Sequence, residues 1–294
     1  MSGNLTITTF TDPMMGLSWE CEPIFRKLET HFTGQIEFRT VMALLVRNVR
    51  NFMTQDELAL PPAEGIRRYN ARLAKIYESE ETISGMPINM TRFRLFSVEQ
   101  PSSLPLNLAY HAARQTDASK ADLFLYNLRY ATIVDCRPTT ETDELVNVAK
   151  TTGIDTDTFL RHFRDGSAKA ALNEDLRLTQ SMGIHSLPAY LLQYGGKAML
   201  LRSFDYQDFA SVISQLTNGT RKPQSAAPTG ETLREFLREH PLISFIELRE
   251  AFDFADTETV RELVQPLIER GEAKIEDAYH GWFVRVKSFY AGVF

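Results

Sequence analysis

The chain has 294 residues, of which 43% are hydrophobic and 24% are charged, and its formal net charge is −6 at pH 7. Such a composition is typical of a soluble globular protein with one large or two smaller domains. No apolar run is long enough to cross a bilayer, so we expect no membrane partner. The acidic balance disfavours nucleic acid as a partner, because phosphate recognition depends on clustered lysine and arginine side chains.

The N-terminus and the cysteines indicate a compartment. Residues 1–6 contain neither a basic nor an apolar stretch, so we expect no secretory signal. Cys21 and Cys136 are the only cysteines, too few for a disulfide framework or a structural zinc site. We therefore expect a cytoplasmic protein with reduced thiols and no bound metal.

The N-terminal residues predict a strand, a helix and a second strand. Residues 5–10 (LTITTF) alternate apolar and β-branched side chains, which is typical of a strand. Residues 18–32 place apolar side chains at helical spacing, and Gly34 follows as a stop signal. Residues 36–46 (IEFRTVMALLV) predict a second, buried strand. Two strands joined by a helix imply a parallel pair with a crossover connection.

The middle of the chain, from about residue 55 to residue 182, changes to helical periodicity. The predicted helices cover residues 63–79, 104–115, 118–132, 141–151, 156–163 and 172–182. We therefore predict an all-helical insertion between β-rich ends.

Strand signals return near residue 184. Residues 189–194 (AYLLQY) and 197–201 (KAMLL) predict a hairpin across two glycines that tolerate positive φ. Residues 205–216 predict a closing helix. We place the first domain at residues 1–217 and a linker, rich in Pro, Gly, Ser and Thr, at residues 218–230.

The last part of the chain, residues 231–294, predicts a separate small α+β domain. Its predicted helices cover residues 232–239, 244–252 and 257–270, and a hairpin follows at residues 273–277 and 281–286. This is the order of a winged helix, a fold that often binds DNA through its third helix. The tail, however, has eight Lys and Arg against thirteen Asp and Glu, a net charge of −5. We favour a docking or protein-contact role, with Phe245, Phe254 and Trp282 as candidate contact residues.

Three segments resemble one known family. The loop DPMMGLSW at residues 12–19 is similar to that family's DPxCxxCW redox loop, and GIHSLPAYLL at residues 183–192 is similar to its GVxGvPtf segment. LVNVAKTTGID at residues 145–155, followed by Phe159, is similar to its LxxiAxxxGlD…F segment. Residues 4–217 thus resemble the DsbA-like thioredoxin-fold proteins, particularly the cytoplasmic FrnE-like and SpxH/YjbH-type branch of dithiol-disulfide isomerase-like proteins. The resemblance implies an α/β, thioredoxin-like fold with an inserted helical domain.

The resemblance also identifies what this chain lacks. Met15 and Ser18 occupy the two cysteine positions of the family's redox loop. A thioether has no ionisable proton, and thiol–disulfide exchange requires an attacking thiolate, so we expect no catalytic residue in this loop. Cys21 lies within the helix between two glutamates, whose charges raise a thiol pKa. We interpret both Cys21 and Cys136 as packed structural residues.

In the family, the proline of the second segment is cis and faces the redox loop, and backbone groups beside it pair with extended peptides. We therefore predict a cis bond between Leu187 and Pro188, although few X–Pro bonds are cis. Met14 and Met15, together with Leu187 and Pro188, are predicted to form an apolar, adaptable contact surface. The predicted peptide-binding groove consists of Met14, Met15, Gly16, Leu17, Ser18, Trp19, His185, Leu187 and Pro188. The leading hypothesis is a non-catalytic adaptor that binds a protein or an extended peptide and needs no cofactor.

Two alternative functions remain open. Kappa-class glutathione transferases and hydroxychromene-carboxylate isomerases share the fold and hold the glutathione thiolate with a serine that corresponds to position 15 of this chain. Ser18, one helical turn further on, is the candidate for that role here, which makes glutathione a possible ligand. The other alternative is a DNA-binding regulator that acts through the C-terminal domain. A zinc enzyme is not predicted, because the six histidines show no ligand spacing.

Overall fold

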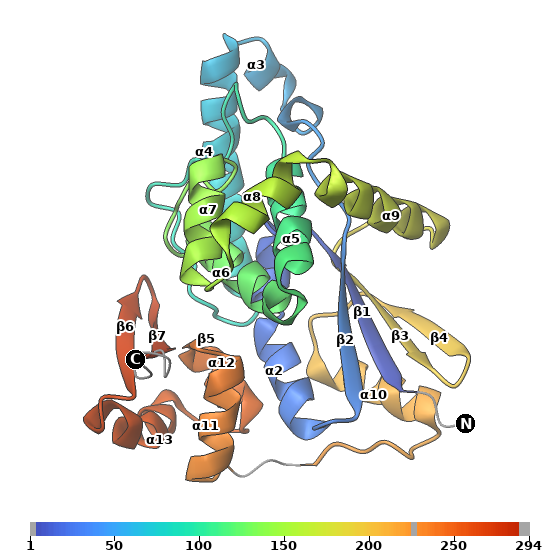
Figure 1. The fold of residues 1–294 in the computed structure, drawn as a ribbon, viewed down its shortest axis with the longest axis vertical. Helices are drawn as coiled ribbons and strands as arrows, with labels where there is room; N and C mark the ends of the chain where they lie inside the picture. The colour runs from blue at the N-terminus through green and yellow to red at the C-terminus, as the bar shows by residue number, and fades with distance from the viewer. Residues whose placement is uncertain (1–3, 225–227, 288–294) are drawn as a thin grey trace.

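The computed structural model describes residues 4–224 and 228–287. The ends of the predicted domains at residues 1–3 and 288–294, and residues 225–227 of the predicted linker, lie outside the described residues. Figure 1 shows a central sheet flanked by helices, a helical block at one end of the sheet, and a C-terminal unit beside α2. The predicted boundaries at residues 217 and 231 stay predictions.

The N-terminal part is organised around a four-stranded sheet with the strand order β2-β1-β3-β4. β1 (Leu5–Thr11) pairs in parallel with β2 (Ile36–Met42) and antiparallel with β3 (Ala189–Tyr194), which pairs with β4 (Lys197–Leu201). The helical crossover between β1 and β2 has the predicted topology. The mixed sheet, with helices packed against it, confirms the predicted α/β, thioredoxin-like fold class.

The central strands β1 and β3 carry buried side chains on both faces of the sheet, since successive side chains along a strand point to opposite faces. One face packs against α2 (Glu22–His31) and α10 (Tyr206–Thr217). Its buried sheet residues are Leu5, Ile7, Tyr190 and Leu192. The opposite face has a smaller cluster, which contains Phe10, Val41, Ile184, Ala189 and Leu191.

Two predicted N-terminal elements are shorter than expected. The single helix over residues 18–32 is instead two helices, α1 (Gly16–Glu20) and α2, separated at Cys21. Pro23 explains the break, because a proline has no backbone N–H to donate to the preceding turn. The predicted strand over residues 36–46 ends at Met42. Beyond it, the backbone N–H groups of residues 44–46 bond to the side chains of Asn107, Asp12 and Ser103 instead of to a strand.

The chain between β2 and β3 forms the predicted helical block. Its helices are α3 (Gln55–Leu58), α4 (Pro62–Glu80), α5 (Leu104–Thr116), α6 (Ala121–Ile133), α7 (Thr142–Thr151), α8 (Thr156–Arg164) and α9 (Ser167–Ser181), with 3-10 turns at Val49–Asn51 and Ala118–Lys120. α9 begins at Ser167 rather than at residue 172, because Ala168 and Leu172 both face the core. The apolar faces of these helices meet in one large core, which also contains Met14 and Trp19 of the N-terminal loop.

The C-terminal unit, residues 228–287, has the helix and strand order of a winged helix. Its elements are α11 (Gly230–Glu239), β5 (Leu242–Ser244), α12 (Phe245–Ala251), α13 (Thr257–Glu269), β6 (Ala273–Ala278) and β7 (Gly281–Val286). The three strands form one sheet with the order β5-β7-β6. The sequence did not predict β5, because three residues are too few to show strand alternation.

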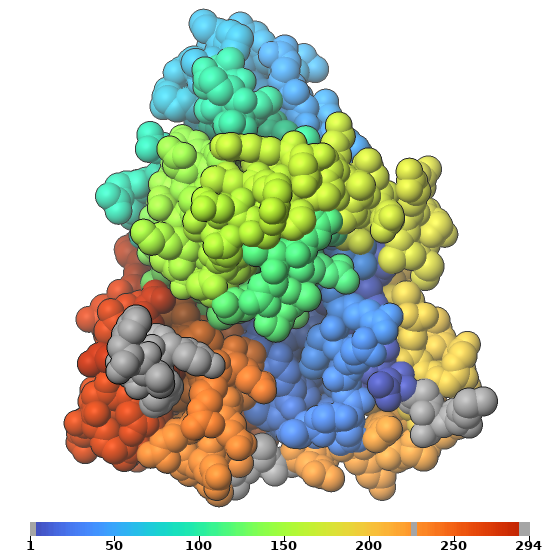
Figure 2. All heavy atoms as spheres, viewed as in Figure 1, coloured from blue at the N-terminus to red at the C-terminus, as the bar shows by residue number. Residues whose placement is uncertain are grey.

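The C-terminal unit is docked on the rest of the chain. α12 lies along α2, and Leu242, Ile246 and Phe283 join the apolar core of the helical block. In the space-filling view its orange and red atoms abut the blue and green atoms of the N-terminal part (Figure 2). Two of the three predicted contact residues were assigned wrongly: Phe254 and Trp282 pack within the unit's own core, and only Phe245 touches both cores.

Candidate functional site

The loop between β1 and α1 is held by a buried carboxylate. The Asp12 side chain accepts hydrogen bonds from the backbone N–H groups of Met14 (3.1 Å) and Leu45 (2.8 Å). It also accepts from the Ser103 hydroxyl (2.7 Å) and the Asn107 amide (2.9 Å). Burial raises the pKa of Asp12, although all four hydrogen bonds oppose the shift. Asp12 therefore fixes the loop to β2 and to the start of α5.

Helix α4 covers this loop. The Tyr77 hydroxyl donates a hydrogen bond to the Met14 carbonyl oxygen. A Cβ atom on Gly16 would lie 2.0 Å from the Glu80 carboxylate and 2.5 Å from the Tyr77 ring. Met14 is 2% exposed and Met15 is 6% exposed. The prediction that these methionines form part of a contact surface is therefore wrong, because both side chains are buried and Tyr77 and Glu80 of α4 pack against the loop.

Two more acidic groups are buried around α1. Burial raises the pKa of Glu80 to about 7, and one of its carboxylate oxygens has no hydrogen-bond partner among the described residues. Glu20 also has a pKa raised to about 7 by burial, despite hydrogen bonds from the Ser84 backbone and hydroxyl. The burial that raises both pKa values also disfavours a thiolate beside these groups.

Ser18 is connected to a chain of buried polar side chains. Its hydroxyl is 2.7 Å from the Thr11 hydroxyl, which accepts a hydrogen bond from Arg129 (2.9 Å). Arg129 donates to Glu22 (2.7 Å), and Glu22 accepts from Arg26 (2.8 Å). Ser18 is only 3% exposed. The residue in the second cysteine position thus holds the start of α1 in place and has no access to a solvent-borne substrate.

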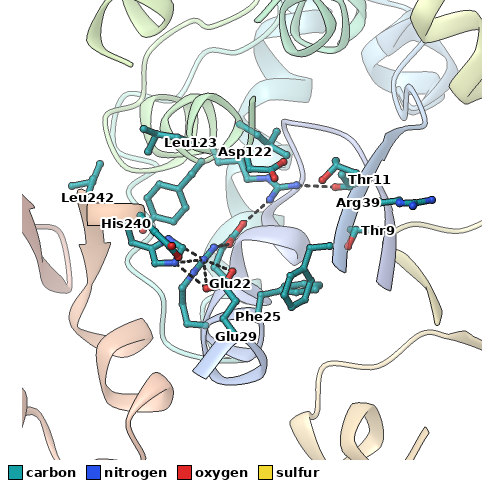
Figure 3. A pocket seen from close by; sticks show the side chains of 17 residues that line it. Thr9, Thr11, Glu22, Phe25, Glu29, Arg39, Asp122, Leu123, His240 and Leu242 are labelled. Carbon is teal, nitrogen blue, oxygen red and sulfur yellow. Dashed lines mark hydrogen bonds and ion pairs between the residues drawn. The ribbon is translucent and has the colours of Figure 1, made fainter. Parts of the chain in front are cut away.

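The same chain reaches the C-terminal unit at Arg26 of α2. Arg26 contacts Glu29 (2.7 Å) on its own helix, His240 (2.9 Å) at the end of α11 and Glu247 (3.3 Å) of α12. Arg26, Glu29 and His240 line a cavity of 210 Å³ between α2, α6 and the C-terminal unit. Figure 3 shows Glu22, Glu29 and His240 close together at this cavity. The charged side chains therefore connect two parts of the chain that are far apart in sequence.

Glu247 is the most buried member of this cluster. Its carboxylate accepts hydrogen bonds from the Tyr126 hydroxyl (2.6 Å) and from the Ser244 backbone N–H (2.8 Å). Burial raises its pKa to about 7, against the lowering effect of the Arg26 charge. Glu247 thus has a raised pKa although its carboxylate lies 3.3 Å from the Arg26 guanidinium.

The remaining predicted site residues lie at the end of β3. The peptide bond between Leu187 and Pro188 is cis, as predicted. Phe10 pairs with Ala189, so Pro188 lies opposite the last residue of β1. His185, in contrast, is exposed and lines a groove beside α9, and Leu187 packs on the smaller sheet cluster. Trp19 points the other way, into the helical block, where its indole N–H donates to the Pro87 carbonyl oxygen (3.1 Å).

Neither Cys21 nor Cys136 is placed to carry out thiol–disulfide exchange in place of the missing cysteines. Cys21 is fully buried, accepts a hydrogen bond from the Tyr190 hydroxyl (2.9 Å) and has its pKa raised to about 12 by burial. Cys136 donates to the Asn89 carbonyl oxygen (2.7 Å), and burial raises its pKa as well. Both thiols are free, with pKa values above the ordinary one, and this disfavours the thiolate that exchange chemistry requires.

Sequence reasoning missed the residues that close the site. Asp12 stood in the quoted loop motif, but nothing in the sequence showed that its carboxylate bonds to residues 45, 103 and 107. Tyr77, Arg129 and Glu247 lie on helices far along the chain and gave no local signal. Among the described residues, no group of three or more His, Cys, Asp or Glu side chains is placed to hold a metal ion. No helix described by the structure is long and apolar enough to span a bilayer.

Comparison with known proteins gives both a family and a set of relatives. A sequence profile of the thioredoxin family matches residues 8–195. The ClpXP adapter protein SpxH of Bacillus subtilis is 22% identical over 293 residues, which cover 98% of this chain and 91% of the relative. The protein of the same name from Bacillus licheniformis is 24% identical and covers 96% and 88% of the two chains.

Two solved structures with a similar fold have titles that describe disulfide isomerase or reductase enzymes. A putative protein disulfide isomerase from Nitrosomonas europaea superposes with a TM-score of 0.56 at 15% identity, covering 74% of this chain and 97% of that one. The cytosolic disulfide reductase DsbM from Pseudomonas aeruginosa gives a TM-score of 0.54 at 20% identity, covering 72% and 98%. At this level of identity the likeness establishes the fold alone.

Proposed function

Because the chain belongs to the thioredoxin family and has a DsbA-like fold with an inserted helical block, we propose that it is a non-catalytic adaptor that delivers a protein substrate to the ClpXP protease. The observation that carries this proposal is the redox loop itself. Met15 and Ser18 replace the cysteines, and both side chains are buried. The chain therefore keeps the thioredoxin fold, but its loop has neither the thiols nor the solvent access that thiol–disulfide exchange requires.

The extent of the similarity supports the adaptor function over the oxidoreductase function. The SpxH relatives match almost the whole chain, including the C-terminal unit, whereas the oxidoreductase structures leave about a quarter of it uncovered. In this chain the C-terminal unit is docked through a buried arginine cluster and an aromatic contact. Two units fixed in one orientation provide a large composite surface, which suits a protein that holds other proteins.

The structure gives no support to the two alternatives. A glutathione-dependent enzyme would need the Ser18 hydroxyl to reach the ligand, but that hydroxyl is buried and bonded to Thr11. A DNA-binding regulator would need positive charge on the third helix, but α13 carries Glu258, Glu262 and Glu269 against one arginine. We therefore propose proteins as the partners.

We place the protein-binding surface at the exposed part of the predicted groove. Met14, Met15, Gly16, Ser18 and Trp19 are buried and hold the loop. His185 is exposed, and Leu187 is half-buried beside it. The contact surface is thus displaced from the former redox centre toward the segment that precedes Pro188 and the neighbouring α9.

The test is a reconstituted degradation assay. Protein half-lives are first compared, after protein synthesis is stopped, in cells with and without this chain and in cells without ClpX. At least one protein should be stabilised by both deletions. That protein, purified, should be degraded several-fold faster by purified ClpXP and ATP when the full chain is added. If no protein depends on both, or if the purified chain leaves the degradation rate unchanged, the adaptor proposal is wrong.

A further inference from the structure

A groove of 680 Å³ lies between α9, the loop after β2 and the segment that leads to Pro188. Its walls include two arginines, Arg47 and Arg177, and the imidazole of His185. In Figure 1 α9 projects on the side of the molecule away from the C-terminal unit. The groove is therefore separate from the arginine cluster that holds that unit.

The positive charge in this groove is not neutralised by the protein itself. Arg47 and Arg177 are exposed, and neither forms a salt bridge with any residue that the structure describes. No carboxylate lines the groove. The acidic neighbour Asp175 is turned to the other side of α9, where it accepts from the Met42 backbone N–H (2.7 Å) and lies 3.1 Å from His111. The two guanidinium groups are left available for an external anion.

Apolar side chains accompany these charges. Leu44 and Ile184 are buried at the base of the groove, and Leu176 is half-buried in its wall. Leu178 on the same helix and Met182 directly after it are also exposed, at 42% and 40%, but they do not line the groove. Apolar side chains that accompany charged ones in a groove are typical of a protein-contact surface.

We propose that this groove binds an acidic segment of a partner protein, with carboxylates on Arg47 and Arg177 and apolar side chains against Leu44 and Leu176. The proposal rests on the proposed adaptor function only in naming a substrate protein as the source of that segment. Arginine pairs with carboxylates through two parallel hydrogen bonds, which gives such a contact geometry as well as charge. Nucleic acid fits less well, because no aromatic side chain lines the groove for base stacking.

The experiment uses the full chain and three defined probes. The first is a short fluorescein-labelled peptide rich in glutamate and leucine. The second is the same peptide with lysine in place of every glutamate, and the third is a labelled oligothymidine. Fluorescence anisotropy is measured for the wild type, for the Arg47→Glu, Arg177→Glu double variant and for Lys169→Glu. Lys169 is exposed on α9 outside the groove, so its variant makes the same change of charge as Arg177→Glu on the same helix.

The acidic peptide should bind the wild type, and its affinity should fall as salt is raised. The two charge reversals should weaken binding about tenfold, because each exposed ion pair contributes modestly, and Lys169→Glu should change it less than twofold. Equal binding of the lysine peptide, tighter binding of oligothymidine, or no effect of the double variant would overturn the proposal.

The two proposals fail separately. If the double variant loses the peptide but accelerates ClpXP degradation as the wild type does, the groove is not where a substrate protein docks, and the adaptor function stands. If the peptide binds as expected but no protein is delivered to ClpXP, the proposal that the groove binds an acidic segment is supported and the proposed adaptor function is wrong.

Discussion

Met15 stands where the redox loop of the family has its first cysteine, and Tyr77 and Glu80 of α4 enclose the loop around it. A thiol introduced there would sit at a helix start, where backbone N–H groups favour a thiolate. Access, however, is closed by α4. The identity of the side chain and the cover above it therefore both prevent thiol exchange, and mutagenesis separates the two effects.

Restoring the cysteines alone should not restore the reaction. We expect Met15→Cys with Ser18→Cys to leave insulin reduction by dithiothreitol at its background rate, because the new thiols stay covered. Adding Tyr77→Ala and Glu80→Ala, which open the cover, should raise the rate above background. The rate is followed by the turbidity of the reduced insulin chains. Turnover by the double cysteine variant alone would mean that α4 does not seal the loop.

A substitution at Gly16 tests, through the stability of the protein, whether α4 packs tightly on the loop. A methyl group at this position would meet the Glu80 carboxylate and the Tyr77 ring, so α4 must move. We expect Gly16→Ala to lower the free energy of unfolding by about 1–3 kcal/mol, as overpacking of a buried site does. Gly230→Ala is the matched control, because the nearest atom to its new methyl group lies 4.0 Å away. Equal midpoints for both variants in urea would show that the cover is loose.

At the scale of elements, α2 and α12 are joined by a group whose charge depends on pH. Because the pKa of Glu247 is raised from its ordinary value of 4.5 to about 7, the folded protein keeps a proton that the unfolded chain has already lost. The free energy of unfolding should therefore fall as pH rises from about 4.5 through 7, by at most about 3 kcal/mol from this group.

Glu247→Gln should remove that part of the pH dependence, since an amide keeps the hydrogen bonds without titrating. Urea unfolding measured between about pH 5 and pH 8 should show a smaller decline for the variant than for the wild type. Glu235→Gln, which removes an exposed carboxylate from α11 of the same unit, serves as the control and should follow the wild type. Parallel curves for wild type and Glu247→Gln would contradict the assignment of the proton to Glu247.

The elements themselves were largely predictable, and their contacts were not. Strand alternation and helical spacing are local, so the sheet strands, the hairpin and most helices were predicted from sequence. Pro23 was a local signal for the separation of α1 from α2. The helical spacing of Trp19 and Leu28 nevertheless predicted one continuous helix. Tyr77 contacts the buried Met14, and Arg26 contacts the buried Glu247, although the two residues of each pair are far apart in the chain. Such contacts leave no pattern in a single sequence.

At the scale of the whole molecule, the docked C-terminal unit completes the core of the helical block. The Phe283 ring lies 4.9 Å from the Tyr130 ring and 6.2 Å from the Trp19 ring, between centroids. Lys27 of α2 adds an ion pair to Asp253 (2.7 Å), and Thr30 donates to the Ala251 carbonyl oxygen (2.5 Å). The winged-helix order was read from the sequence, but its orientation depends on these pairs.

Cutting the chain between the two parts should not separate them. A protease site inserted in the predicted linker at residues 218–230 allows the cut to be made after folding. We expect the two fragments to co-elute in gel filtration at micromolar concentration. With Phe283→Ala, which removes an aromatic side chain from the shared core at a cost of about 3–5 kcal/mol, they should separate. Separate elution of the unmutated fragments would contradict stable docking.

The central claim is that this chain works as an adaptor without thiol chemistry. The most direct measurement is the rate at which ClpXP degrades the dependent protein in the presence of Cys21→Ala, Cys136→Ala, a full chain with no cysteine left. We expect the variant to accelerate degradation to the same extent as the wild type, in the presence and in the absence of dithiothreitol. Acceleration that disappears with the cysteines, although the variant is folded, would contradict the claim.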